Sequence, residues 1–192
     1  MKKIEKLDIT KEKLITAAGR LIDSCDESAV VTSRAIANEA GVQLAMINYC
    51  FGSREALLFE TFCRRENEYK NDPLLLEIFR AEIPPKEKLR RLHYVIAEFL
   101  IKNYKYSKAI TGYVLLHRDL SKELNSLPLV TAHYNGRKTQ QECRIISYEL
   151  SSVMQLAVYR HKELENFSGF DLTDTAQLHK FVDLQIDLFL KD

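Results

Sequence analysis

The stretch that decides the fold is AIANEAGVQLAMINYCFGSREAL, residues 35–57. A helix-forming segment reaches Gly41, and a second one runs only from Gln43 to Cys50 before Phe51-Gly52 interrupts it. Because glycine adopts a positive φ without strain, Gly41 is expected to end the first helix and turn the chain. The pattern therefore predicts two helices joined by a tight turn, the second of them short.

Helices are also predicted on both sides of this turn. Apolar residues at helical spacing between Leu14 and Ile22 indicate a first helix that begins near Ile9. Thr32 or Ser33 is a suitable N-cap for the second helix. Ser53 is a suitable N-cap for a fourth helix that covers residues 54–70.

The rest of the chain also has a helical pattern. Glycine and proline number six and four, and they fall at plausible breaks, one of them at Asn71-Asp72-Pro73. We expect a long helix over about residues 139–164, a loop in which Thr173 caps the next helix, and a last helix over about 175–190. The sequence predicts an all-α protein with a division between residues 1–70 and 71–192.

Composition limits the class of protein. No run of eighteen apolar residues occurs, so we expect no membrane span. The charged N-terminus lacks the apolar segment of a signal peptide, which favours a cytoplasmic location. The net charge is +1, and the first seventy residues carry eleven basic and eleven acidic side chains. Bulk charge therefore provides no sign of nucleic-acid binding, and this neutrality leaves open a helical protein-interaction adaptor.

Motifs for catalysis or metal binding are not found in the sequence. The four cysteines and five histidines lack the spacing of zinc sites or disulfide frameworks. No nucleophile elbow, glycine-rich phosphate loop or paired-carboxylate pattern occurs. We therefore expect no metal, no cofactor and no enzymatic activity.

A helix, a tight turn and a short second helix together have the geometry of a helix-turn-helix. The short helix of this motif enters the DNA major groove, where its first residues and outer face meet base edges. An ordinary helical hairpin without a DNA role has the same pattern and remains the alternative.

Residues 14–58 resemble the DNA-binding domain of the TetR family of transcriptional regulators. The resemblance rests on AAGRLI, on VTSRAIANEAGV and on INYCFGSREALL. It covers about a quarter of the chain. The resemblance implies an N-terminal helix-turn-helix domain followed by a helical bundle that binds an effector and dimerises, although the second part has no diagnostic motif.

The resemblance also implies DNA-binding roles for single residues. Arg34 matches a position that contacts a phosphate or guanine, and Arg54 matches a phosphate-binding position at the start of the fourth helix. The exposed start of the recognition helix would be formed by Gln43, Leu44, Ala45 and Met46, and its phosphate-contacting end by Asn48 and Tyr49.

Two of these positions have alternatives that stay open. Met46 can pack inward rather than contact thymine methyl groups. Cys50 stands where the family has His or Tyr; it is either a small buried apolar residue or an oxidant sensor.

For the second part, the resemblance implies a ligand pocket and a dimer interface. Ordinary core packing is the alternative for each pocket candidate. The pocket candidates are Tyr94, Phe99, Tyr113, His117, Tyr148 and Met154. The interface candidates are Leu150, Val153, Ala157, Leu178, Phe181, Val182, Gln185, Leu188 and Phe189.

Together these features predict a homodimeric, ligand-responsive regulator that binds a double-stranded DNA operator. A small molecule of unknown identity would release a repressor by favouring a conformation that no longer fits the DNA. An activator or a DNA-organising protein is an alternative that the sequence leaves open.

Overall fold

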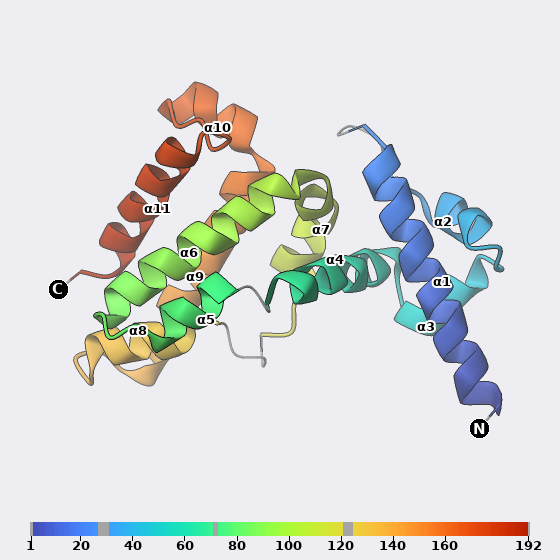
Figure 1. Ribbon diagram of the computed structural model, residues 1–192, viewed down its shortest axis with the longest axis horizontal. Coiled ribbons are helices and arrows are strands. Elements are labelled where there is room, and N and C mark those ends of the chain that lie inside the picture. The colour runs from blue at the N-terminus through green and yellow to red at the C-terminus, as the bar shows by residue number, and fades with distance from the viewer. Residues whose placement is uncertain (1, 27–30, 71–72, 121–124, 192) are drawn as a thin grey trace. The chain divides into compact units, whose positions relative to one another are not determined.

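The computed structural model describes residues 2–26, 31–70, 73–120 and 125–191, with side chains described from residue 6 on except at 66–70 and 73–74. Every regular element in these ranges is a helix, which confirms the predicted all-α class (Figure 1). Within the described ranges, none of the helices is both long and apolar enough to cross a membrane. The helices are α1 (Lys2–Ser24), α2 (Ser33–Glu39), α3 (Ala45–Phe51), α4 (Arg54–Lys70), α5 (Pro73–Arg80), α6 (Pro85–Lys102), α7 (Tyr104–His117), α8 (Leu127–Tyr134), α9 (Gln140–Tyr159), α10 (His161–Ser168) and α11 (Thr175–Phe189).

The helices group into two compact units. The first consists of Met1–Tyr69 and Lys108–His117, and the second of Lys70–Ser107 and Arg118–Asp192. Most of α7 therefore groups with the N-terminal unit. The functional division at residue 70 stays a prediction, and the expected break at Asn71-Asp72 lies outside the described residues.

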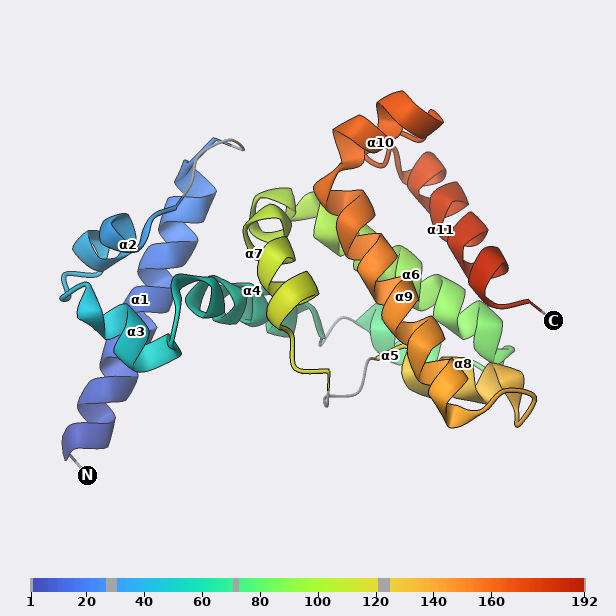
Figure 2. The ribbon, with the colours of Figure 1, turned by 180° about the vertical axis from the view of Figure 1, so that it is seen from behind.

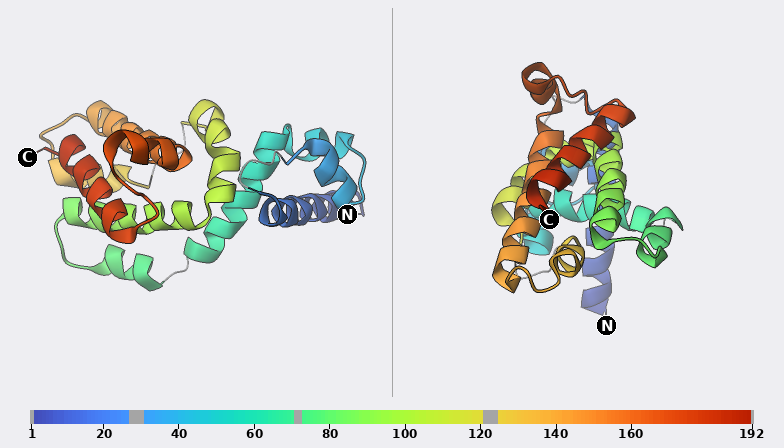
Figure 3. Two further views of the ribbon diagram at one scale, coloured as in Figure 1. Left: turned by 90° about the horizontal axis from the view of Figure 1, so that it is seen from above. Right: turned by 90° about the vertical axis from the view of Figure 1, so that its left-hand side faces the viewer.

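In the N-terminal unit, α2 and α3 both pack against α1. The view from above in Figure 3 shows α2 and α3 on the same side of α1. The apolar face predicted for α1 is buried, although α1 begins at Lys2 rather than near Ile9. Arg64 of α4 holds the Glu12 carboxylate of α1 with two guanidinium nitrogens. The side chains that fill this core are Leu14, Ala18, Ile22, Ile36, Ile47 and Leu57.

The turn between α2 and α3 depends on Gly41, which has φ +64° and so confirms the predicted positive φ. The Gly41 N–H donates to the Asn38 carbonyl (3.1 Å), and the Val42 N–H donates to the Ala37 carbonyl (3.0 Å). These two bonds form a Schellman motif, which satisfies carbonyls that the end of α2 would otherwise leave unpaired. The turn releases the chain directly into α3, which begins at Ala45, two residues after the expected start.

Caps fix the other ends of these short helices. The Thr32 hydroxyl accepts a hydrogen bond from the Ala35 N–H (3.1 Å), and the Ser53 hydroxyl accepts one from the Ala56 N–H (3.0 Å). Both predicted caps are confirmed. Side-chain oxygens at these positions satisfy backbone donors in the first turn of a helix, so the starts of α2 and α4 are locally encoded.

In the C-terminal unit, α6 is the central helix and packs against α5, α8, α9 and α11. Figure 2 shows α6 with α9 and α11 beside it. The long helix expected over residues 139–164 is wrong as a single element, because α9 ends at Tyr159 and α10 follows after Arg160. The break turns His161 into the core, where its ring packs edge-on against Tyr104.

The start of α11 also differs from the expectation. Asp174, rather than Thr173, is the N-cap, and its carboxylate accepts a hydrogen bond from the Gln177 N–H (2.9 Å). Thr173 instead donates its own N–H and hydroxyl to Asp171 (2.8 and 2.7 Å). Thr173 is thus bonded to Asp171 within the loop, and Asp174 caps the helix.

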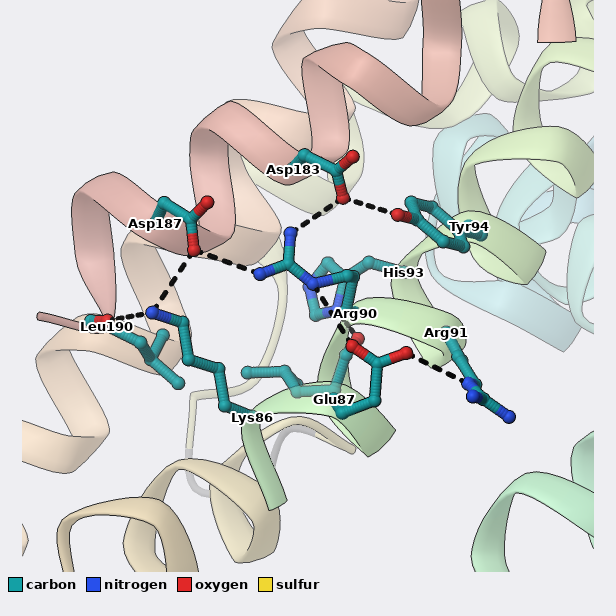
Figure 4. A network of polar contacts seen from close by, with 10 residues as sticks. Lys86, Glu87, Arg90, Arg91, His93, Tyr94, Asp183, Asp187 and Leu190 are labelled. Atoms are coloured by element: carbon teal, nitrogen blue, oxygen red, sulfur yellow. Dashed lines mark hydrogen bonds and ion pairs between the residues drawn. The ribbon is translucent and has the colours of Figure 1, made fainter. Parts of the chain in front are cut away.

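A seam of polar side chains joins α6 to α11 (Figure 4). Arg90 donates to Asp183 (2.6 Å) and Asp187 (2.9 Å), and Lys86 pairs with Asp187 (3.1 Å) and donates to the Leu190 carbonyl (2.7 Å). The Tyr94 hydroxyl donates to Asp183. These α6 residues are spaced four apart and meet α11 residues four apart in reverse order, so the two helices are antiparallel.

The seam is partly shielded from water. The Arg90 side chain is only 18% exposed, and it lies against two carboxylates. Hydrogen bonding to Lys86, more than Arg90, holds the pKa of Asp187 below its ordinary value, although burial opposes this. Burial and the Asp183 carboxylate raise the pKa of Tyr94 to about 12, so its hydroxyl remains a donor at neutral pH. The network therefore links α6 to α11 through hydrogen bonds and ion pairs and fixes the register of α11 on α6.

Replacing Arg90 by Gln should lower the free energy of unfolding by about 1–3 kcal/mol, because it leaves two neighbouring carboxylates without their shared cation. Urea unfolding followed by circular dichroism measures this. Arg91→Gln is the matched control, because Arg91 is 49% exposed and pairs with Glu87 on its own helix. It should cost less than about 0.5 kcal/mol; equal effects of the two changes would contradict a special role for Arg90.

Replacing Gly41 by Ala should destabilise the N-terminal unit by about 1–2 kcal/mol, because an L-residue is strained at φ +64°. The control is Gly112→Ala in the interior of α7, where a Cβ would meet no atom within 4 Å. That change should instead stabilise by about 0.5–1 kcal/mol, because alanine loses less backbone entropy in a helix. Thermal unfolding of both variants tests the opposite signs.

Candidate nucleic-acid interface

The short helix α3 buries one residue and exposes three of the other six. Ile47 lies in the core, while Leu44 and Tyr49 are 48% and 65% exposed. Gln43, Ala45 and Asn48 are also exposed. Residues 44, 45, 48 and 49 share one face of a helix because they recur at intervals of about one turn. Three of the residues predicted for the exposed start of the recognition helix and both of those predicted for its phosphate-contacting end thus lie on one outward surface, which we call the α3 face: residues 43–45, 48 and 49.

Two predicted positions on α3 lie at the edge of this surface. Met46 is half-buried, so it is neither fully packed inward nor fully exposed for contact with thymine methyl groups. Cys50 is also half-buried. Burial raises the pKa of the Cys50 thiol, although the charge of Lys11 from α1 opposes that shift. Half-burial, together with the smaller amount of thiolate that a raised pKa leaves at neutral pH, favours the apolar interpretation of Cys50 over oxidant sensing.

The two arginines with predicted DNA roles differ in their surroundings. Arg34 is exposed at the start of α2. The Arg54 guanidinium at the start of α4 is already engaged, because Nη1 donates to the Val31 carbonyl (3.3 Å) and Nε donates to Glu55 Oε1 (2.9 Å). Its Nη2 lies 2.7 Å from the same oxygen. The phosphate-binding role of Arg54 stays a prediction.

The Glu55 carboxylate is charged in this arrangement. Burial opposes its ionisation, but its own backbone N–H, Arg54 and His117 more than offset that effect, and its pKa lies below the ordinary value. Neither Glu55 nor Lys11 was among the predicted site residues. The signals available in the sequence were an acidic residue directly after Arg54 and the lysine-rich start of the chain.

The predicted pocket residues are divided between the two units. Tyr113 and His117 group with the N-terminal unit, where the Tyr113 ring lies 5.1 Å from that of Phe59. In the C-terminal unit, Tyr94 stacks on His179 (4.0 Å between ring centroids) within the α6–α11 seam. The other candidates there are the buried Phe99 and Met154 and the exposed Tyr148. Ligand binding by these six residues stays a prediction.

Most predicted interface residues lie inside the chain's own core. Leu150, Ala157, Leu178, Phe181 and Val182 are buried within a single copy, so they have little surface to offer another copy. Val153, Gln185 and Phe189 are half-buried, and Leu188 is 54% exposed. The dimer stays a prediction, and these positions show that the expected apolar stripes mainly serve intramolecular packing.

A different apolar stripe is exposed on α9. It was not predicted, because the sequence pattern does not show which face of a doubly apolar helix turns outward. Its members lie within a narrow arc of the helix, since they recur near multiples of one turn. The stripe consists of Ile145, Tyr148, Leu156 and Tyr159, and we call it the α9 stripe.

No family model and no curated protein matches the sequence. The structure, however, is similar to solved structures over nearly its full length. A TetR transcriptional regulator from Rhodococcus sp. RHA1 has a TM-score of 0.54 at 13% identity, covering 96% of this chain and 97% of that one. A TetR-like transcriptional regulator from the same organism has a TM-score of 0.50 at 18% identity, covering 94% and 93%. The chain therefore has the fold of TetR-like transcriptional regulators.

Proposed function

We propose that this protein is a cytoplasmic, non-catalytic regulator of transcription that binds double-stranded DNA. The observation that supports this most is the α3 face, because a seven-residue helix that buries only Ile47 adds little to the core. Its exposed residues combine amide, hydroxyl and apolar groups, which suit base edges and thymine methyl groups in the major groove. The fold and the resemblance of residues 14–58 to the TetR family support the same function.

Operator binding of this kind uses two copies of the chain. Two recognition helices must reach successive major grooves, roughly 34–36 Å apart or a multiple of that. The α9 stripe and the exposed Leu184 and Leu188 of α11 supply apolar surface for a homodimer. The α6–α11 seam supports this role, because it holds α11 in one position.

Ligand response completes the proposal. We propose a repressor that a small molecule releases from its operator by favouring a conformation in which the two α3 faces no longer match the groove spacing. The helix α4 supports this, because it begins beside the helix-turn-helix and its last residue, Lys70, groups with the C-terminal unit. Activation of transcription would instead be indicated by operators placed upstream of the promoter.

The direct test is recovery and sequencing of genomic fragments bound by the purified protein, followed by binding measurements on the enriched site. Gln43→Ala should reduce discrimination against a mutated operator by about 1–3 kcal/mol, because an exposed glutamine amide can pair with adenine. Gln141→Ala, an exposed glutamine of α9, is the control and should change nothing. Enrichment of no sequence over background would refute the proposed function and favour a protein-interaction adaptor.

The dimer has its own test. Leu156→Glu places a charge in the α9 stripe and should raise the dimer dissociation constant at least about tenfold, since a buried leucine contributes about 1.5–3 kcal/mol. Sedimentation velocity over a concentration series measures this. Phe167→Glu is the control, because Phe167 is 89% exposed on α10, outside the stripe. Dissociation by both variants, or by neither, would argue against the α9 stripe as the interface.

A further inference from the structure

The Arg54 guanidinium has one edge fully used by a neighbour. Both Nε and Nη2 point at the same oxygen, Glu55 Oε1, at 2.9 and 2.7 Å. This pair of donors is one that a guanidinium can present to a phosphate in a bidentate contact. While Glu55 holds that edge, Arg54 cannot offer it to a second anion.

The other hydrogen bond of Arg54 holds its guanidinium in place. Nη1 donates to the Val31 carbonyl, 23 residues earlier, directly before the α2 cap Thr32. This contact belongs to the fold and keeps the guanidinium beside the helix-turn-helix. The Glu55 contact, in contrast, comes from the next residue in the chain and adds no link between distant elements.

The pair is accessible from solution. The side chains of Arg54 and Glu55 are 29% and 43% exposed. Ion pairs of this exposure contribute little to stability, so another anion can replace Glu55 as the partner of Arg54. A phosphate that approaches the start of α4 is attracted by Arg54 and by the positive end of the helix dipole, and it is repelled by Glu55.

We propose that Glu55 is a positioning residue that restrains Arg54 in the free protein, and that a DNA phosphate replaces it on the Nε–Nη2 edge. The inference rests on the proposed function, since it concerns the same DNA contact. Glu55 then lowers affinity for every duplex alike, because the exchanged contact is to the backbone and carries no sequence information.

A double-mutant cycle tests this through Arg54 itself. The variants are Glu55→Gln, Arg54→Ala and the double variant, measured at one salt concentration on the enriched operator and on a random duplex of equal length. Glu55→Gln should tighten both complexes about two- to fivefold. Arg54→Ala should weaken both alike, and adding Glu55→Gln to it should then give a smaller gain, the part due to direct repulsion of phosphate by Glu55. An equal gain with and without Arg54 would overturn the proposal, because Glu55 would then act only by direct repulsion.

The control for lost negative charge is Glu60→Gln, since Glu60 is exposed on the same helix. A tightening by Glu60→Gln equal to that by Glu55→Gln would also overturn the proposal. The proposal would also be overturned if Glu55→Gln left DNA affinity unchanged or lowered it while the circular dichroism spectrum stayed like that of the wild type.

A measurement without DNA separates this inference from the proposed function. In the free protein, the Arg54 Nε–H signal in ¹⁵N NMR should exchange with water more slowly than in Glu55→Gln, because the carboxylate protects it. Equal exchange rates would show that Glu55 does not restrain Arg54, whatever the DNA experiments give. If the Arg54 Nε–H exchanges slowly with water but the protein binds no duplex, Glu55 does restrain Arg54. The replacement of Glu55 by a phosphate and the proposed function would then both be refuted.

Discussion

The positive φ of Gly41 is the constraint on which the candidate site depends. It allows two hydrogen bonds to close the end of α2 within two residues, so α3 can begin at Ala45. A longer connection would let α3 rotate about its axis, and Ile47 would no longer be the residue that enters the core. With the turn fixed, burial of Ile47 determines which residues of α3 face outward. The composition of the α3 face is therefore a consequence of one backbone conformation and one apolar anchor.

The C-terminal unit solves a different problem, that of placing a last helix with two apolar sides. The inward side of α11, with Leu178, Val182 and Ile186, is buried against the rest of the unit. Apolar burial is not directional, so it favours contact without setting the register. The spaced charges of the α6–α11 seam supply that register, because each bond requires one residue opposite another. Leu184 and Leu188 are then left at the surface.

The features that could be predicted from sequence are those decided within a few residues. Thr32, Gly41 and Ser53 cap or turn the chain through bonds to neighbours three to five residues away, and each was correctly placed. The break at Arg160 could not be predicted, because it serves a contact between His161 and Tyr104, more than fifty residues apart. A continuous helical pattern contains no sign of such a contact.

The same limit applies to the site and the interface. Helical periodicity shows that α9 and α11 are apolar on several sides, but only packing shows that Leu150 and Val182 turn inward while Leu156 turns outward. The sequence also did not show which contacts the Arg54 side chain makes. Its match to a phosphate-binding position was visible in the sequence, whereas its bonds to Val31 and Glu55 depend on where α4 begins relative to α2.

The neutral charge of the N-terminal seventy residues takes on a different meaning in the folded chain. Residues 41–52 contain no charged side chain, so the α3 face itself is neutral. Several acids of this unit lie beside arginines: Glu12 with Arg64, Glu39 with Arg20, and Glu55 with Arg54. Attraction to phosphate therefore has to come from the edge of the site, where it depends on local pairing and not on net charge. In the proposed function, a neutral surface bordered by restrained cations would limit binding to random DNA, and hydrogen bonds and apolar contacts from the α3 face would supply the preference for one sequence.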